Sequence, residues 1–288
     1  MQHISFEFFP PKGDEGQERL GGICDKLNAR EPEFFSVTYG AGGSTRSNTQ
    51  ATVKNILEKG IDVAPHLSFG QDDEATMLSL LTEYREMGVR RLVALRGDRP
   101  SGMSASGSLV YANQLVAFIR EHFDSHFHIE VAAYPEIHPE AESYQKDIYY
   151  LGEKFRAGAN SAITQYFYNP EAYFYFIDQC AKQGIQAPII PGIMPILNVE
   201  SLLRFSSKCG ADIPRWLQYR LNQFRDDKAS LQAFGQDYCA DLCRKLLDFG
   251  APGLHFYTMN QSRATLAILD QLDPPAPAAK SATVVSLR

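Results

Sequence analysis

The chain alternates between two kinds of segment, and this alternation limits its possible folds more than any other feature. Short runs rich in β-branched and aromatic residues are each followed by a longer segment of helical periodicity. Several runs are continuously apolar, which is typical of parallel strands covered on both faces. We expect strands at Ile4–Phe8, Phe34–Tyr39, Val63–Ser68, Leu92–Leu95, Ile129–Ala133, Ser161–Phe167, Ile189–Ile193 and Leu254–Thr258.

Eight such β–α units within 288 residues favour the α/β class and a closed (β/α)8 TIM barrel, since about 250 residues is the usual size of that fold. The alternative is an open sheet in which one supposed strand is only a loop. Extra helices are expected before the last strand, at Val199–Lys208 and within 213–249. We expect residues 1–272 to form one barrel domain and residues 273–288, rich in Pro and Ala, to form a flexible tail.

The composition excludes several functional classes. A hydrophobic fraction of 44% with 22% charged residues is ordinary for a globular enzyme, and a net charge of −6 disfavours nucleic acid as a partner. No apolar run approaches the ~20 residues that cross a bilayer, and Met1 leads into the first strand without a signal sequence, so we expect a cytoplasmic protein without membrane contact. The five cysteines are scattered and complete no zinc site, so we expect reduced thiols and no metal.

The first expected strand carries one ionisable residue, Glu7, inside an apolar run that stops at Pro10 and Pro11. An unpaired buried charge costs several kcal/mol. Glu7 is therefore ion-paired, placed at the mouth of a pocket, or kept protonated, and the protonated state is the one that a proton donor needs. The alternative is a structural carboxylate that accepts hydrogen bonds from backbone N–H groups or an Arg.

Polar side chains gather where the expected strands end. In a (β/α)8 barrel the reacting groups come from these carboxyl ends, although a structural hydrogen bond explains any single one equally well. The set lacks a Schiff-base Lys, a metal-binding pair and an activated nucleophile, so it indicates a site built around an organic cofactor. The polar residues are Glu7, Thr38, Tyr39, His66, Arg96, Asp98, Tyr134, His138, Gln165, Tyr257 and Asn260.

A dinucleotide would need anion-binding groups other than the Rossmann glycines, because no Gly-x-Gly-x-x-Gly turn follows the first strand. Arg96 followed by Gly97 is a candidate, since glycine permits close backbone approach and a guanidinium binds phosphate. The alternative for Arg96 is an ion pair with Asp98 or Glu7.

Eight sequence blocks fall in order on the expected strand ends. The blocks are Ser5–Pro11, Ser36–Ala41, Ala64–Leu67, Ala94–Asp98, Ala132–Glu140, Gly158–Gln165, Ile190–Ile193 and His255–Thr258. Together they resemble bacterial 5,10-methylenetetrahydrofolate reductases, and the resemblance extends from about Ile4 to Leu272.

The resemblance implies a (β/α)8 barrel that binds FAD without a Rossmann motif. It implies ping-pong kinetics, in which NADH or NADPH reduces the flavin and 5,10-methylenetetrahydrofolate then accepts the hydride at the same face. The product, 5-methyltetrahydrofolate, supplies methyl groups for methionine synthesis. The alternatives are a non-catalytic flavin- or folate-binding barrel and a reductase of another pterin or iminium substrate. The resemblance also suggests a homo-oligomer, and it leaves NADH against NADPH open.

The resemblance assigns roles residue by residue. It makes Glu7 the general acid, places Asp98 near the flavin pyrimidine and the pterin, gives Gln165 contacts to pterin and nicotinamide, and makes Phe205 a substrate contact. The implied FAD-binding residues are Thr38, Tyr39, Ala41, His66, Arg96, Gly97, Asp98, Ala112, Tyr134, His138, Ala141, Asp147 and Lys154.

Four positions depart from the pattern of these reductases, and two of them, Tyr150 and Glu153, stand where polar or basic FAD contacts are expected. Gln261 stands where an Arg that helps to hold the folate is expected, and Ser201 stands where a Gln is expected. The changes at Gln261 and Ser201 concern contacts to the folate tail and the nicotinamide more than the flavin chemistry.

Overall fold

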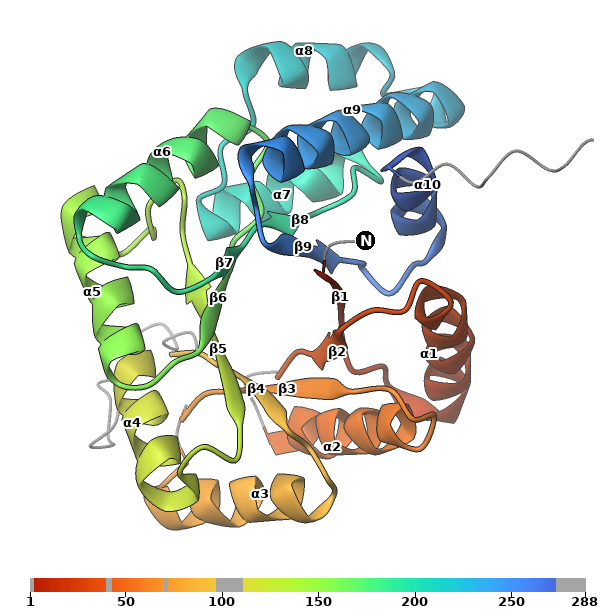
Figure 1. The fold of residues 1–288 in the computed structure, drawn as a ribbon. Helices are drawn as coiled ribbons and strands as arrows, with labels where there is room; N and C mark the ends of the chain where they lie inside the picture. The colour runs from red at the N-terminus through yellow and green to blue at the C-terminus, as the bar shows by residue number, and fades with distance from the viewer. Residues whose placement is uncertain (1–2, 40–42, 70–71, 97–110, 273–288) are drawn as a thin grey trace, which may run out of the picture.

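The computed structural model describes residues 3–39, 43–69, 72–96 and 111–272. Within these residues, parallel strands form a nearly closed barrel with helices around its outside (Figure 1). The strand order is β7-β6-β5-β4-β3-β2-β1-β9-β8. The strands are β1 His3–Phe8, β2 Phe34–Val37, β3 Val63–Leu67, β4 Arg91–Ala94, β5 His128–Ala133, β6 Ser161–Thr164, β7 Ile189–Ile190, β8 Gly192–Ile193 and β9 Gly253–Tyr257.

The seventh barrel strand is split by Pro191 into β7 and β8. β7 pairs with β6 through Ala162 and Ile163, whereas β8 pairs with β9 through His255 and Phe256. Proline has no N–H to give to a ladder, but its carbonyl accepts from the amide of His255 at 3.0 Å. The two fragments thus join both edges of the sheet, and the predicted (β/α)8 barrel is confirmed with one interrupted strand.

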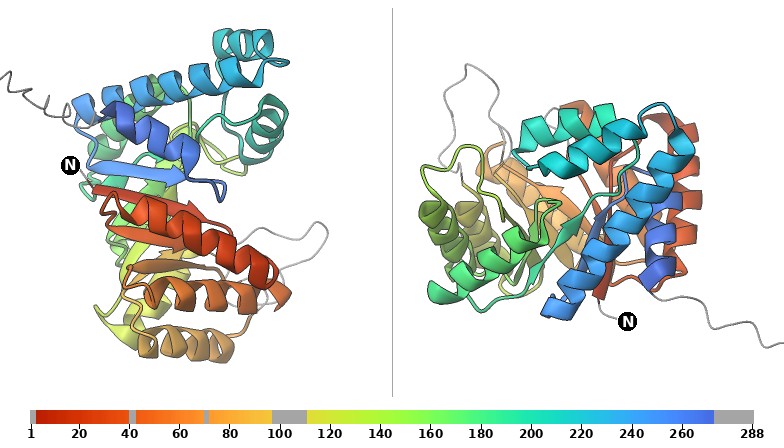
Figure 2. Two further views of the ribbon diagram at one scale, coloured as in Figure 1. Left: turned by 90° about the vertical axis from the view of Figure 1, so that its right-hand side faces the viewer. Right: turned by 90° about the horizontal axis from the view of Figure 1, so that it is seen from above.

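The helices follow the strands in the expected alternation, and three of them lie between β8 and β9, where extra helices were predicted (Figure 2). The contacts of α9 with α6 and α10 place it in the outer ring, so α7 and α8 are the additions. The helices are α1 Gly13–Asn28, α2 Gly43–Leu57, α3 Glu74–Glu86, α4 Ala112–Phe123, α5 Tyr144–Arg156, α6 Pro170–Lys182, α7 Val199–Cys209, α8 Arg215–Gln223, α9 Lys228–Phe249 and α10 Arg263–Leu272.

The apolar core lies in two places. The large layer fills the space between the sheet and the helices, and Phe6 and Phe8 of β1 belong to it. A small cluster inside the barrel consists of Phe34, Ala64, Val93 and Ile163 from four different strands. Toward the carboxyl ends of the strands, polar side chains such as Glu7, His66 and Gln165 face the barrel interior.

The described residues contain no helix that is both long enough and apolar enough to cross a membrane.

Candidate active site

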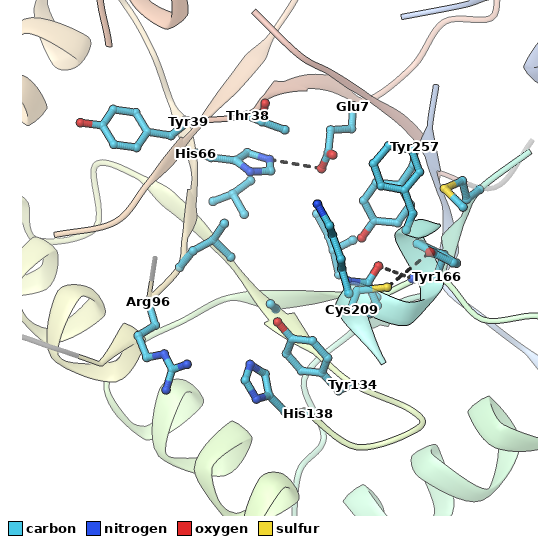
Figure 3. A pocket seen from close by; sticks show the side chains of 18 of the residues that line it. Glu7, Thr38, Tyr39, His66, Arg96, Tyr134, His138, Tyr166, Cys209 and Tyr257 are labelled. Carbon is cyan, nitrogen blue, oxygen red and sulfur yellow. Dashed lines mark hydrogen bonds and ion pairs between the residues drawn. The ribbon is translucent and has the colours of Figure 1, made fainter. Parts of the chain in front are cut away.

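A cavity of about 580 Å³ opens at the carboxyl ends of the strands (Figure 3). This volume lies in the range of sites for small organic ligands. Glu7, His66, Tyr39 and Thr38 lie on one side of it, and Arg96, His138 and Tyr134 lie across from them. The remaining wall includes Gln165, Tyr166, Met194, Phe205, Lys208, Cys209, Tyr257 and Met259.

Glu7 reaches the cavity because side chains alternate between the two faces of a strand. Phe6 and Phe8 point to the helix layer, where their rings lie 5.7 Å and 5.1 Å from the ring of Phe35. Glu7 therefore points inward, with only 12% of its side chain exposed. The flanking phenylalanines do not form its surroundings, and the groups that do are two histidines.

His66 and His255 face the carboxylate of Glu7. Nε2 of His66 lies 3.4 Å from Oε2 of Glu7, and Nε2 of His255 lies 3.7 Å from the same oxygen. Burial lowers the pKa of His66, the negative charge of Glu7 opposes this shift, and His255 adds to it. His66 is therefore neutral near pH 7, and it presents a neutral imidazole to Glu7 rather than a fixed positive charge.

Ser5, two residues before Glu7 on the same face of β1, orients His255. Its Oγ is hydrogen bonded to Nδ1 of His255 at 2.7 Å. When the hydroxyl donates to Nδ1, His255 carries its proton on Nε2, the atom that faces Glu7. Among the described residues, neither Nε2 of His255 nor Nε2 of His66 has a hydrogen-bond partner. Buried polar atoms of this kind mark places where a bound molecule or water completes the network.

The side of the cavity formed by the loop after β5 is held by a chain of polar contacts. Asp147 accepts from the backbone N–H of His138 at 2.8 Å, and Nδ1 of His138 accepts from the backbone N–H of Glu140 at 3.0 Å. Burial lowers the pKa of His138, and the nearby Arg96 lowers it further. Neutral His138 with an occupied Nδ1 carries its proton on Nε2, so this edge of the ring is a donor.

Arg96 forms an ion pair with Glu140 on the same side of the cavity. The expected partners in the alternative interpretation were Asp98 and Glu7. Glu7 is instead engaged by the histidines across the cavity, and Asp98 lies outside the described residues.

A third wall of the cavity is built by β6, β9 and α7. The hydroxyl of Tyr257 donates to the carbonyl of Thr164 at 2.7 Å, which fixes the ring beside Gly192. Oε1 of Gln165 accepts from the backbone N–H of Tyr166 at 3.0 Å, so the amide of Gln165 has one defined orientation. These contacts orient the side chains of Tyr257 and Gln165 within the wall.

Most of the predicted site residues meet at this cavity: Glu7, Thr38, Tyr39, His66, Arg96, Tyr134, His138, Gln165 and Phe205. Ala112, Ala141, Asp147 and Lys154 do not line it. Lys154 donates to the carbonyl of Ala132 at 2.8 Å, and burial lowers its pKa to about 8. Ala41, Gly97 and Asp98 lie outside the described residues. The binding roles of all these residues stay predictions.

Several wall residues were missed by the reasoning from sequence. Tyr166 follows the predicted Gln165, and Lys208 and Cys209 follow Phe205 by three and four positions on α7. Helical spacing from Phe205 was the signal that could have found the last two.

Asn260, one of the polar residues expected near the site, has a structural contact instead. Its side-chain amide accepts from the backbone N–H of Phe9 at 2.8 Å and donates to the carbonyl of Phe9 at 2.9 Å. Asn260 thus holds the end of β1.

Comparisons with known proteins give one consistent family. The family model described as "Methylenetetrahydrofolate reductase" matches residues 1–273. The chain is 38% identical over 271 residues to the 5,10-methylenetetrahydrofolate reductase of Escherichia coli (strain K12), covering 94% of this chain and 90% of that protein. It is 41% identical over 265 residues to the reductase of the same name from Buchnera aphidicola subsp. Schizaphis graminum, covering 92% and 89%.

The chain is also similar to a plant relative and to a solved structure. The chain is 36% identical over 285 residues to "Methylenetetrahydrofolate reductase (NADH) 1" of Arabidopsis thaliana, which covers 93% of this chain but 48% of the plant protein. A structure described as an uncharacterized protein from Clostridium thermocellum that binds two copies of 5-methyl-5,6,7,8-tetrahydrofolic acid has a TM-score of 0.63 at 19% identity, covering 94% of this chain and 93% of that one. At that identity the likeness shows the fold.

Proposed function

The chain belongs to the methylenetetrahydrofolate reductase family, and we propose that it reduces 5,10-methylenetetrahydrofolate to 5-methyltetrahydrofolate. NADH or NADPH is the proposed reductant and FAD the proposed cofactor. The observation that carries the proposal is the placement of Glu7, a largely buried carboxyl group that faces a cavity of about 580 Å³ between two histidines. The product would supply methyl groups for methionine synthesis.

The donor set of the cavity fits a flavin. Nε2 of His66 has no hydrogen-bond partner among the described residues, and the Nε2 edge of His138 offers a donor on the other side. Arg96 adds a guanidinium suited to phosphate or ribityl oxygens. FAD held by these residues would supply hydride transfer between the nicotinamide and the folate, and the two substrates would occupy the same cavity in turn.

Glu7 would act as the proton donor. Reduction of the one-carbon bridge requires its five-membered ring to open, and protonation of the bridging nitrogen makes that nitrogen a leaving group. The position of Glu7 suits this step because the carboxyl group is shielded from water and faces neutral His66. His255, hydrogen bonded to Ser5, would keep the carboxyl group in one orientation.

The other walls would orient the substrates. Gln165 presents an amide whose Oε1 is fixed by the N–H of Tyr166, so its remaining hydrogen-bonding groups would meet the pterin and the nicotinamide in turn. Phe205 offers an aromatic surface on α7 for the flat rings that extend out of the cavity. Asp98 is proposed to disfavour negative charge on the reduced flavin, which would make it a better hydride donor.

Further parts of the proposal concern the whole protein. We assign residues 1–272 to one catalytic domain and 273–288 to a tail, with Ala41, Gly97, Ala112, Ala141, Asp147 and Lys154 completing the FAD site. The five free cysteines suit a reducing compartment such as the cytoplasm. A homo-oligomer is also proposed.

Anaerobic stopped-flow absorbance tests the function directly. Purified protein should carry flavin, lose its absorbance near 450 nm with NADH or NADPH, and regain it when 5,10-methylenetetrahydrofolate is added. Running each nicotinamide separately gives the preferred donor. Protein that takes up no FAD, or reduced protein that the folate does not reoxidise, would contradict the proposal.

A further inference from the structure

We propose that Lys208 is a specificity-determining residue that binds a carboxylate of the glutamate part of the folate. This inference rests on the proposed function and adds a contact that the sequence analysis did not predict. Its basis is the position of one cation on α7, the helix that forms the outer wall of the cavity.

Lys208 and Phe205 lie on the same face of α7, because residues three positions apart are neighbours on a helix surface. Both side chains line the cavity. Phe205 is half-buried, whereas Lys208 is exposed, so the cation stands nearer to solvent than the ring. The helix thus presents an aromatic surface followed outward by a positive charge.

The charges of the described wall residues make Lys208 distinctive. Arg96 is held by Glu140, and His66 and His138 both have pKa values lowered by burial. Lys208 forms no ion pair or hydrogen bond with any described residue. The loop after β9 contributes Met259 to the cavity, which carries no charge. Lys208 is therefore the available cation of the described wall.

The proposed substrate has the matching order of groups. A folate consists of a pterin, then an aminobenzoyl ring, then glutamate with two carboxylates. With the pterin near Glu7, the aminobenzoyl ring would extend along the wall of α7 and meet Phe205. The glutamate would then reach the outer part of the cavity, where an ammonium group can pair with a carboxylate without first breaking another ion pair.

The test compares Lys208→Met and Lys208→Arg with the parent protein, after the parent has been shown to reduce the folate. Methionine keeps the apolar stem and removes the charge, and arginine keeps the charge. The matched control is Lys182→Met, an equal loss of charge at the last turn of α6, at the amino end of the barrel and away from the cavity. The substrates are 5,10-methylenetetrahydrofolate and 5,10-methylenetetrahydropteroate, which lacks the glutamate.

Lys208→Met should raise the KM for the full folate about three- to tenfold, as expected for one partly exposed charge pair. The same change should appear in the Kd of 5-methyltetrahydrofolate for the oxidised protein, measured by difference absorbance, and it should shrink as salt is added. For the pteroate the parent and Lys208→Met should differ by less than twofold. Lys208→Arg should restore most of the folate affinity, and Lys182→Met should behave as the parent.

Three results would overturn the inference. An equal loss with folate and pteroate would assign Lys208 a role in the shape of the wall. A change confined to the KM of NADH or NADPH would assign it to the dinucleotide. Unchanged folate binding in Lys208→Met would show that Lys208 does not bind the folate. A parent protein inactive with the folate is a different outcome, because it contradicts the proposed function itself.

Discussion

Nε2 of His66 lies 3.4 Å from Oε2 of Glu7, and both side chains are largely buried. Because burial lowers the pKa of His66, this contact joins a carboxyl group to a neutral ring. A fixed cation at the same place would favour the carboxylate and work against proton donation. The pair therefore places no fixed cation beside the carboxyl group that we propose as the proton donor.

Replacing Glu7 with Gln should separate the two half-reactions. Flavin reduction by the nicotinamide needs no proton from Glu7 and should stay within about threefold, whereas reoxidation by the folate should slow by about 10²- to 10⁴-fold, the usual contribution of a general acid. Anaerobic stopped-flow measures both steps. Glu58→Gln, an exposed carboxylate beyond the last turn of α2, is the control. Equal reoxidation rates in Glu7→Gln and the parent would remove Glu7 from the mechanism.

The pH dependence of stability should reveal Glu136, which accepts from the backbone N–H of Asp212 at 2.8 Å. Burial raises the pKa of Glu136 from 4.5 to about 7. Between these values the folded state binds more protons than the unfolded state, so this group's contribution to stability is complete below pH 4.5 and is lost as pH rises through 7.

Glu136→Gln should therefore be more stable than the parent at pH 8 by about 1–2 kcal/mol, discounted for partial exposure, and equally stable at pH 4.5. The amide oxygen of Gln can still accept from Asp212. Urea unfolding at the two pH values, at fixed FAD concentration, measures the difference. A variant that is less stable at pH 8 would show that the charged form is the favoured one.

Gly192 should tolerate no side chain. A Cβ there would lie 2.2 Å from the carbonyl oxygen of Thr164 and 2.6 Å from the ring of Tyr257. Gly192→Ala should destabilise the protein by about 3 kcal/mol, since backbone must move to make room. Gly22→Ala on α1, where a Cβ meets nothing within 4 Å, should instead stabilise by about 0.5–1 kcal/mol. Thermal unfolding of both variants gives the comparison, and a harmless Gly192→Ala would refute the packing at the strand break.

Glu140 should compete with the cofactor for Arg96. In Glu140→Gln the guanidinium is released from its ion pair, so FAD should bind about three- to tenfold more tightly if Arg96 holds an anionic part of it. Arg96→Gln should bind FAD more weakly. Titration of apoprotein with FAD, followed by fluorescence quenching, measures both. Asp178→Asn, which breaks the ion pair with Lys182 on α6 outside the cavity, is the control and should have no effect.

The sequence predicted the barrel well because hydrophobic runs and helical periods report burial directly. The starts of β2 and β6 were predicted to the residue, but the predicted ends at Tyr39 and Phe167 extend past the observed ends at Val37 and Thr164. Apolar and aromatic residues that follow a strand continue its sequence pattern, so they are predicted as strand even when they line a cavity or pack under a loop. The break at Pro191 depends on how the edges of the sheet meet, which local sequence does not encode.

Reasoning from the residues predicted the site where it follows from strand position, and the family resemblance added Phe205 on α7. Glu7, His66 and Gln165 lie at strand ends, and those positions converge in any barrel of this kind. Lys208 and Cys209 were missed although they follow the predicted Phe205 at helical spacing, and only the angle at which α7 docks, which tertiary packing sets, shows that this face of the helix meets the cavity. The role of Asn260 was missed as well, since the same polar residue would suit a ligand or, as observed, the backbone of Phe9.

Because α7 belongs to an insertion between the two last barrel strands, its residues carry no share of the ladder that closes the ring. In the proposed function, the proton donor and the cofactor-binding groups belong to the barrel strands and the loops after them, whereas Phe205 and Lys208, which would meet the distal part of the substrate, belong to an inserted helix. Preference for the substrate tail would then be open to evolution or engineering through changes in this helix alone, without altering the residues proposed for the hydride transfer.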